Sequence, residues 1–141
     1  MKQVIEDVDF ETREGVEFVD LTDGVRAAVA RAGIAEGTVT VVTRHTTGGI
    51  AVNEREPRLQ EDMKRWIARM CPPGAGYAHD RDTVDGRANA HAHLAALSLR
   101  ASETLLVRGG KLDLGTWQAV FFVECDGPRR RAVSLCIRGT P

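Results

Sequence analysis

The sequence has almost no excess of charge of either sign. It contains 19 Lys and Arg residues against 20 Asp and Glu residues, and apart from the run Arg129–Arg131 the basic residues are dispersed. A nucleic-acid groove needs a wide basic face, so this composition argues against a nucleic-acid partner. The chain also lacks a signal peptide and any apolar run of membrane-spanning length, so no membrane partner is expected.

Cysteine is scarce as well. Cys71, Cys125 and Cys136 are odd in number and lack metal-ligand spacing, so they support neither a disulfide framework nor a zinc ribbon. We interpret them as small buried hydrophobic residues in a reducing compartment and expect a cytoplasmic protein. With no repeat or linker in 141 residues, a single domain over 1–141 with one core is expected.

Several segments have the residue pattern of strands. Residues 4–10 alternate between apolar and polar, and residues 16–19 are their expected hairpin partner. The further predicted strands are 38–45, 50–54, 104–107, 118–125 and 131–138. The β-branched strand 38–45 ends at His45, and the turn Asp126–Arg129 is expected to join the last two strands as a hairpin.

Three segments have helical spacing. The first, 20–33, has Asp20 or Thr22 as its cap and Gly33 at its end. The second begins at Pro57, and its apolar stripe is expected in the core: Leu59, Met63, Trp66, Ile67 and Met70. The third covers about 89–100, after a loop over 71–88 whose length is typical of functional loops.

Three of the four histidines lie in polar or glycine-rich sequence, which suits loops that present an imidazole to a metal. The alternative is that they are scattered surface histidines. Helical residues two positions apart point about 200° away from each other, so His91 and His93 cannot share one ion. Asn89 and His93 share a helix face, which makes His93 the better ligand and leaves His91 facing solvent.

The strand 118–125 carries a second group of candidates. Val120, Phe122, Glu124 and Asp126 project to one face. A half-buried Glu124 needs an arginine, a metal-bound water or a substrate hydroxyl as partner, so an ion pair and a catalytic role both remain open. Arg129 and Arg131 share a face that could bind phosphate or form a solvated edge. The glycine-rich turns match no nucleotide-binding fingerprint.

In order along the chain, the motifs HTTGGIAVNE, NAHAHL, LGTWQ and ECDGPR resemble those of the YjbQ-like family of small uncharacterised proteins, often described as secondary thiamine-phosphate synthases. The resemblance spans nearly the whole chain. Two residues depart from the family pattern. His91 stands where Asp is common, and Gly48 stands where Ala is usual, a change that we expect not to disturb the site.

The resemblance implies an α+β fold in which antiparallel sheets pack with two or three helices, assembled as a compact homotrimer. It also implies a metal site near a subunit boundary, formed by His45, His79 and His93. We accordingly expect catalytic roles for Glu124, Asp126 and Glu54, phosphate binding by Arg129 and Lys111, and substrate positioning by Asn53, Asn89 and Gln118.

The implied reaction joins a hydroxymethylpyrimidine pyrophosphate to a thiazole phosphate and releases pyrophosphate, which requires a cation, arginines and a stacking residue such as Trp117. Three imidazoles favour zinc as the divalent metal, whereas magnesium prefers oxygen ligands and would enter with the substrate. This mismatch keeps two alternatives open. One is a metal-dependent hydrolase, and the other is a non-enzymatic trimer that binds a metal or a small phosphorylated metabolite.

Overall fold

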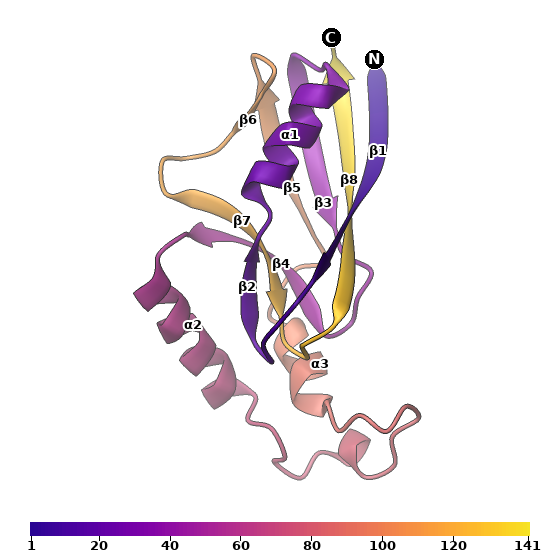
Figure 1. Ribbon diagram of the computed structural model, residues 1–141, viewed down its shortest axis with the longest axis vertical. Coiled ribbons are helices and arrows are strands. Elements are labelled where there is room, and N and C mark those ends of the chain that lie inside the picture. The colour runs from indigo at the N-terminus through magenta and orange to yellow at the C-terminus, as the bar shows by residue number, and fades with distance from the viewer.

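Two antiparallel sheets form the body of the protein, and the helices lie around them (Figure 1). The computed structural model describes residues 1–141. In chain order the elements are β1 (Lys2–Glu11), β2 (Glu17–Asp20), α1 (Thr22–Ala32), β3 (Glu36–Val42), β4 (Gly48–Glu54), α2 (Pro57–Met70), the 3-10 helix η1 (Ala78–Asp80), α3 (Ala90–Ala96), β5 (Ser102–Arg108), β6 (Lys111–Asp113), β7 (Gln118–Glu124) and β8 (Arg130–Thr140). The expected α+β fold is confirmed.

The five-stranded sheet has the order β1-β8-β3-β5-β6, and the three-stranded sheet has the order β2-β7-β4. The expected hairpin between residues 4–10 and 16–19 is wrong, because β1 pairs with β8 along its whole length and β2 pairs with β7. Alternating hydrophobicity predicts which face of a strand is buried but not which strand lies beside it. The eleven-residue β8 offers β1 ten partners, whereas β2 has only four residues.

The expected hairpin of the last two strands is also wrong, because β7 and β8 belong to different sheets. β7 is the central strand of its sheet, so β2 and β4 occupy both of its edges. Its two faces are buried in two different hydrophobic clusters, Val120 and Phe122 in one, Phe121 and Val123 in the other. This alternation follows the sequence pattern. The turn after β7 therefore carries the chain from one sheet to the other.

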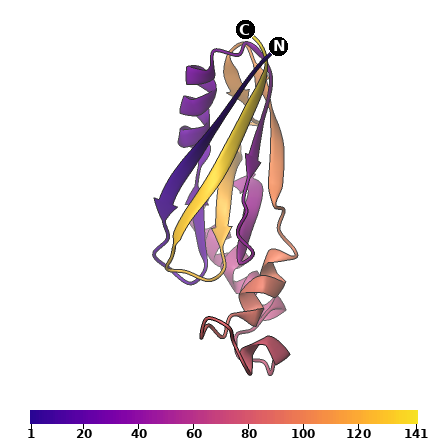
Figure 2. The ribbon, with the colours of Figure 1, turned by 90° about the vertical axis from the view of Figure 1, so that its right-hand side faces the viewer.

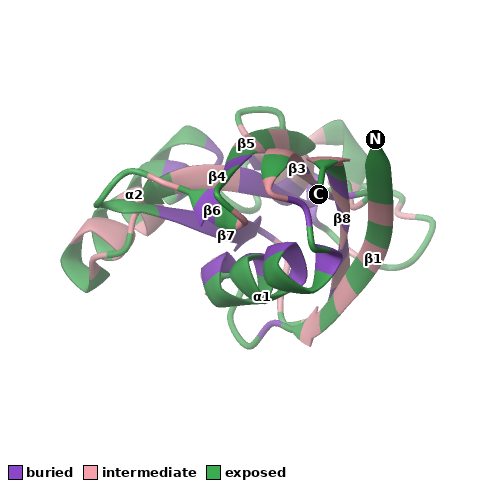
Figure 3. Ribbon diagram, turned by 90° about the horizontal axis from the view of Figure 1, so that it is seen from above, coloured by how far each residue is buried: buried purple, intermediate pink, exposed green.

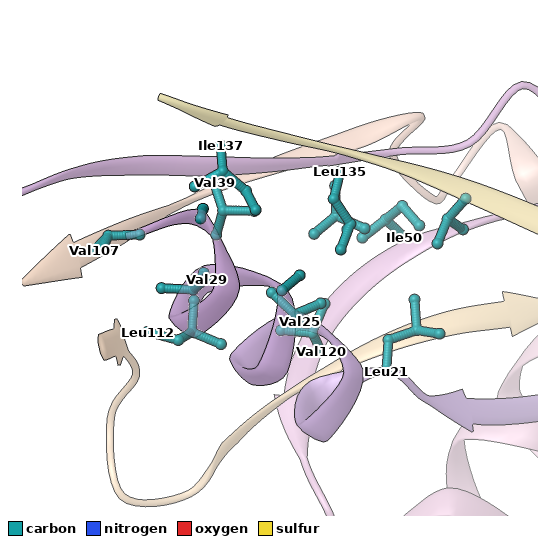
Figure 4. Close-up of a cluster of buried hydrophobic side chains, with 14 of the residues drawn as sticks. Leu21, Val25, Val29, Val39, Ile50, Val107, Leu112, Val120, Leu135 and Ile137 are labelled. Atoms are coloured by element: carbon teal, nitrogen blue, oxygen red, sulfur yellow. The ribbon is translucent and has the colours of Figure 1, made fainter. Parts of the chain in front are cut away.

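The larger cluster fills the space between the five-stranded sheet and α1, which lies along one side of the strands (Figures 2 and 4). The predicted end of α1 at Gly33 is confirmed, whereas its N-cap is Leu21 rather than Asp20 or Thr22. The Asp20 carboxylate accepts a hydrogen bond from the Thr22 N–H at 2.9 Å, and Gly33 has φ 61° in the left-handed region that glycine favours. Val25 and Val29 of α1 are 1% exposed, so this helix is fixed firmly to the sheet.

α2 packs far less than its sequence pattern indicates, and most of its surface is exposed or half-buried (Figure 3). Ile67 is the one buried residue of the helix, whereas Trp66 is 51% and Met70 40% exposed. The prediction that the whole stripe lies in the core is therefore wrong, since periodicity identifies an apolar face but not what covers it. None of the helices is long and apolar enough to cross a membrane.

Candidate functional site

Two pockets that share two lining residues lie at the end of the molecule that carries α3; together we call them the cleft, and each of them a lobe. The first lobe has a volume of about 400 Å³ and is lined by Tyr77, Ala78, His79, Ala90, His93 and Leu94; we call it the Tyr77 lobe. The second has a volume of about 390 Å³ and is lined by His45, Thr46, Gly48, His93, Leu94, Ala96, Leu97, Arg100 and Ala101; we call it the Arg100 lobe. His93 and Leu94 line both lobes and therefore stand between them.

His79 and His93 meet in the Tyr77 lobe. Their rings are 5.0 Å apart between centroids and nearly perpendicular, at 80°. His79 lies on η1 and His93 on α3, and the Asp80 carboxylate accepts the Ala90 N–H at 3.0 Å, which ties η1 to the start of α3. His93, rather than His91, therefore lies beside His79, while the binding of a metal by these two residues stays a prediction.

A hydrogen-bonded chain holds the His79 ring. Its Nε2 lies 3.1 Å from the Asn89 side-chain oxygen, and the Asn89 amide donates to Asp126 at 2.8 Å. Since an amide oxygen can only accept, His79 donates from Nε2 and keeps a free lone pair on Nδ1. Histidines that bind metals are commonly oriented in this way by a second hydrogen-bond partner. Asn89 thus positions the His79 ring, while its expected role in positioning the substrate stays a prediction.

His45 follows β3 and lines the other lobe. Its Nε2 accepts the Ala132 backbone N–H at 3.1 Å, so the neutral ring carries its proton on Nδ1. Burial, and next the positive charge of Arg131, lower the pKa of His45 from its usual 6.5. His45 is therefore neutral at pH 7, with its Nε2 lone pair already used.

The three predicted metal ligands are not brought together within the single chain. No group of three or more His, Cys, Asp or Glu side chains is arranged to hold an ion. His79 and His93 fit as two ligands of a transition metal, but zinc usually takes about four, and His45 has no free lone pair at Nε2. Neither lobe is lined by a carboxylate, so the cleft also lacks the oxygen ligands that magnesium prefers.

Glu124 forms a buried ion pair and lies outside the cleft lining. It is 0% exposed, and its oxygens accept from Arg131 Nε at 2.7 Å and Arg131 Nη2 at 2.5 Å. Thr12 and the Asp126 N–H donate to it as well. Burial alone raises the pKa of Glu124, but the arginine and the other donors outweigh it and hold the pKa below its usual value. Because every oxygen is engaged, the ion-pair alternative holds, and the geometry does not support the expected catalytic role.

Asp126 is the centre of a polar group beside the cleft. It accepts from Asn89, from Arg87 at 3.1 Å and from Arg129 Nη1 at 3.1 Å. Burial raises its pKa, but Asn89 and the two arginines outweigh this effect and lower it. Arg129 is thus oriented by Asp126, yet neither residue is among those that line the two lobes.

Four predicted site residues lie far from the histidines. Lys111 is in β6, at the opposite end of the molecule from α3 (Figure 1). Glu54 pairs in register with Gln118, and Asn53 precedes it, whereas the other end of the same strand pair joins Gly48 to Glu124. At roughly 3.3 Å per residue, the two ends are about 20 Å apart. Asn53 and Glu54 are therefore far from His45 in space, although they belong to the same sequence motif, because the extended strand β4 separates them.

Sequence reasoning missed several residues that the fold brings to this region: Thr12, Asp80, Arg87 and Arg100. Arg131 was considered for phosphate, and the need of a half-buried glutamate for a partner was the signal of its actual contact with Glu124. Thr12 and Arg87 had no such signal, because the residues that they contact are remote in sequence.

His91 does not face solvent as expected. It lines a third cavity of about 320 Å³, together with Cys71 and Cys125, and its Nδ1 is buried without a hydrogen-bond partner. Burial raises the pKa of Cys125 to about 12, so that thiol stays protonated. Helix geometry separated His91 from His93 correctly. The face of α3 that carries His91, however, borders a cavity of its own, just as the face that carries His93 borders the two lobes.

Gly48 is also more constrained than expected. A Cβ at this position would lie 2.5 Å from Phe122 Cζ and 2.8 Å from the Val123 carbonyl oxygen. Alanine at this position would therefore push against the central strand, while the expectation that glycine leaves the site undisturbed stays a prediction.

Comparisons with known proteins agree closely in both sequence and structure. The family described as "UPF0047 protein YjbQ-like" matches residues 6–140. A UPF0047 protein of Methanothermobacter thermautotrophicus is 37% identical over 141 residues, covering 100% of this chain and 96% of that protein. One from Archaeoglobus fulgidus is 44% identical over 122 residues, covering 86% and 91%. The crystal structure of a YbjQ-like protein of unknown function from Sulfolobus solfataricus has 39% identity and a TM-score of 0.91, with 98% of each chain covered.

Proposed function

Because the chain belongs to the YjbQ-like UPF0047 family, we propose that its two-lobed cleft is the active site of a transferase for small phosphorylated metabolites, of the thiamine-phosphate synthase type. The observation that carries the proposal is the position of His93, which lines two lobes of nearly equal volume. Such an arrangement suits a reaction that joins two reactants, one from each side of a single imidazole.

The residues of the chain suit the parts of this reaction. The Tyr77 lobe is mostly apolar and carries the phenol ring, so it suits a planar heterocycle better than the remote, exposed Trp117 does. His79 and His93 would hold a divalent metal, with zinc favoured by imidazole ligands. When bound, such an ion stabilises the negative charge of the leaving pyrophosphate.

Assembly and location form part of the same proposal. A homotrimer would cover exposed apolar side chains that no element of the chain covers, among them Trp66, Met70 and Trp117. The three cysteines are unpaired, which fits a protein that works in the reducing cytoplasm.

The proposal is tested by supplying hydroxymethylpyrimidine pyrophosphate and thiazole phosphate with zinc or magnesium, and measuring thiamine phosphate and pyrophosphate. Equal amounts of both products are expected. His93→Ala should lower the rate by about 100-fold or more, because it removes the imidazole between the lobes. His91→Ala is the matched control, since His91 faces a different cavity on the same helix, and it should keep the rate.

Other outcomes identify the alternatives. Phosphate released from one substrate alone, with an oxygen atom from water, would replace the transferase with a metal-dependent hydrolase. Binding of metal or phosphorylated ligand without turnover, unchanged by added substrates, would indicate a non-enzymatic binding protein.

A further inference from the structure

We infer that the Arg100 lobe is an oxyanion-binding subsite, in which His45 donates a hydrogen bond from Nδ1 and Arg100 supplies the positive charge. This inference rests on the proposed function and assigns the phosphate group of the substrate to one of the two lobes. It also assigns His45 a role other than metal ligation.

The proton of the neutral His45 ring lies on Nδ1. The Ala132 N–H points at Nε2 at 3.1 Å, and a backbone N–H can only donate. The partner nitrogen must therefore be unprotonated, and the neutral ring carries its hydrogen on Nδ1. Ala132 lies within β8 and pairs in register with Asp9 of β1, so the strand pair holds this donor in place.

The hydrogen on Nδ1 of His45 is available to donate to a ligand. His45 Nδ1 makes no hydrogen bond within the chain and is not a buried unpaired atom, in contrast to Nδ1 of His91. His45 lines the Arg100 lobe, and the subsite uses its Nδ1–H, which is not buried. A ligand there meets a donor, not a lone pair.

The Arg100 lobe combines a positive charge with hydrogen-bond donors. Arg100 is the one cationic arginine or lysine side chain among the residues that line either lobe, and no carboxylate lines them. Its Nε lies 3.3 Å from Glu103, and the side chain is 74% exposed, so most of its five donors remain free to turn inward. Thr46 adds a hydroxyl. Donors facing one cavity match a group that only accepts, such as phosphate.

The neighbouring lobe has the opposite character. The His79 Nδ1 lone pair is free, and the remaining lining is apolar or aromatic. The expected phosphate ligands lie elsewhere, since Arg129 pairs with Asp126 and Lys111 lies in β6. The cleft thus separates a subsite for an anionic group from one for a ring, with His93 between them.

The test uses the full chain, treated with a chelator to remove metal, and inorganic phosphate as the probe. Nitrogen-15 spectra at pH 7.5 should show His45 protonated at Nδ1, and phosphate should shift that N–H. Arg100→Gln should weaken phosphate binding about tenfold or more, because a charge-assisted hydrogen bond is lost. Arg108→Gln is the matched control, since Arg108 is an exposed arginine paired with Asp113 in the β5–β6 hairpin, and it should bind as the wild type does.

A second pair of variants separates the role of the donor from the presence of the ring. His45→Asn keeps an N–H donor near the Nδ1 position and should retain more phosphate binding than His45→Ala. Protonation of His45 at Nε2, or equal phosphate affinity in Arg100→Gln and wild type, would overturn the subsite. Loss of bound zinc in His45→Ala, with phosphate binding only in the presence of zinc, would restore His45 as a metal ligand and also overturn it. Phosphate binding is measured without substrates, so a failed transferase assay leaves this result independent.

Discussion

Glu124 and Arg131 are buried so completely that each depends on the other. Their exposed fractions are 0% and 3%, and Arg131 also donates to the Thr47 hydroxyl at 2.8 Å. A buried ion pair adds little net stability compared with apolar residues, but removing one partner leaves the other charge without compensation. The pair thus joins the end of β7 to the start of β8, beside the cleft.

Glu124→Gln should therefore destabilise the protein by about 3–5 kcal/mol, because it leaves the buried guanidinium unpaired. Glu54→Gln, at the other end of the same sheet, should change stability by no more than about 0.5 kcal/mol. Urea unfolding measures both. A small change for Glu124→Gln together with a large loss of activity would instead support the catalytic role that the sequence suggested.

Asp126 links stability to pH. Its pKa is lowered in the folded protein, so its contribution is present above the unfolded value near 3.9 and is lost as pH falls through the lower, folded value. Asp126→Asn should be less stable than wild type at pH 7, and the difference should shrink as the pH falls below about 4. Denaturation at pH 7 and pH 3 measures it. A difference that is equal at both pH values would show that the charge of Asp126 has no part in it.

Among the elements, α1 and β4 contain glycines in opposite environments. Gly24 lies in α1 with open space where a Cβ would be, and it borders a small apolar cavity beside Leu21 and Val25. Gly48 begins β4 against the aromatic ring of Phe122. α1 therefore tolerates a larger residue, whereas the contact of β4 with the central strand does not.

Gly24→Ala should stabilise the protein by about 0.5–1 kcal/mol, because alanine restricts the unfolded chain and favours the helix. Gly48→Ala should destabilise it by about 1–3 kcal/mol through overpacking. Thermal unfolding compares the two variants. If Gly48→Ala is neutral, then the Phe122 ring and the strand behind it shift more easily than the packing indicates.

As a whole, the molecule leaves large apolar side chains exposed in two regions. One is the side of α2 and the β6–β7 loop that carries Trp66 and Trp117. The other is the face of the five-stranded sheet away from α1, where Ile5 is 64% exposed and the Thr40 and Thr104 hydroxyls bond to each other at 2.9 Å. Polar groups that are already paired make such a face less costly to bury.

We expect a homotrimer of about 46 kDa, three times the 15.4 kDa chain, in light scattering at micromolar concentration. Trp66→Lys should lower this mass, because it places a charge on an apolar contact surface. Val84→Lys, in the exposed loop before α3, is the control and should keep the trimer. A mass near 15 kDa for the wild type would reject the assembly, and a mass near 31 kDa would indicate a dimer.

The sequence alone determined the features that depend on neighbouring residues. The end of α1 at Gly33, the alternation of β7 and the separation of His91 from His93 all follow from local geometry, which repeats every few residues. For the same reason, the common face of Asn89 and His93 could be predicted.

Only the tertiary structure decided which distant residues meet. β1 joins β8, Glu124 is saturated by Arg131 and Thr12, and His45 accepts a hydrogen bond from a residue 87 positions later. Such contacts are selected by burial and hydrogen bonding over the whole chain, so no short pattern specifies them. This is why the expected site residues divide as they do, with His79, Asn89 and His93 together, His45 in the adjoining lobe, and Glu54 and Lys111 remote.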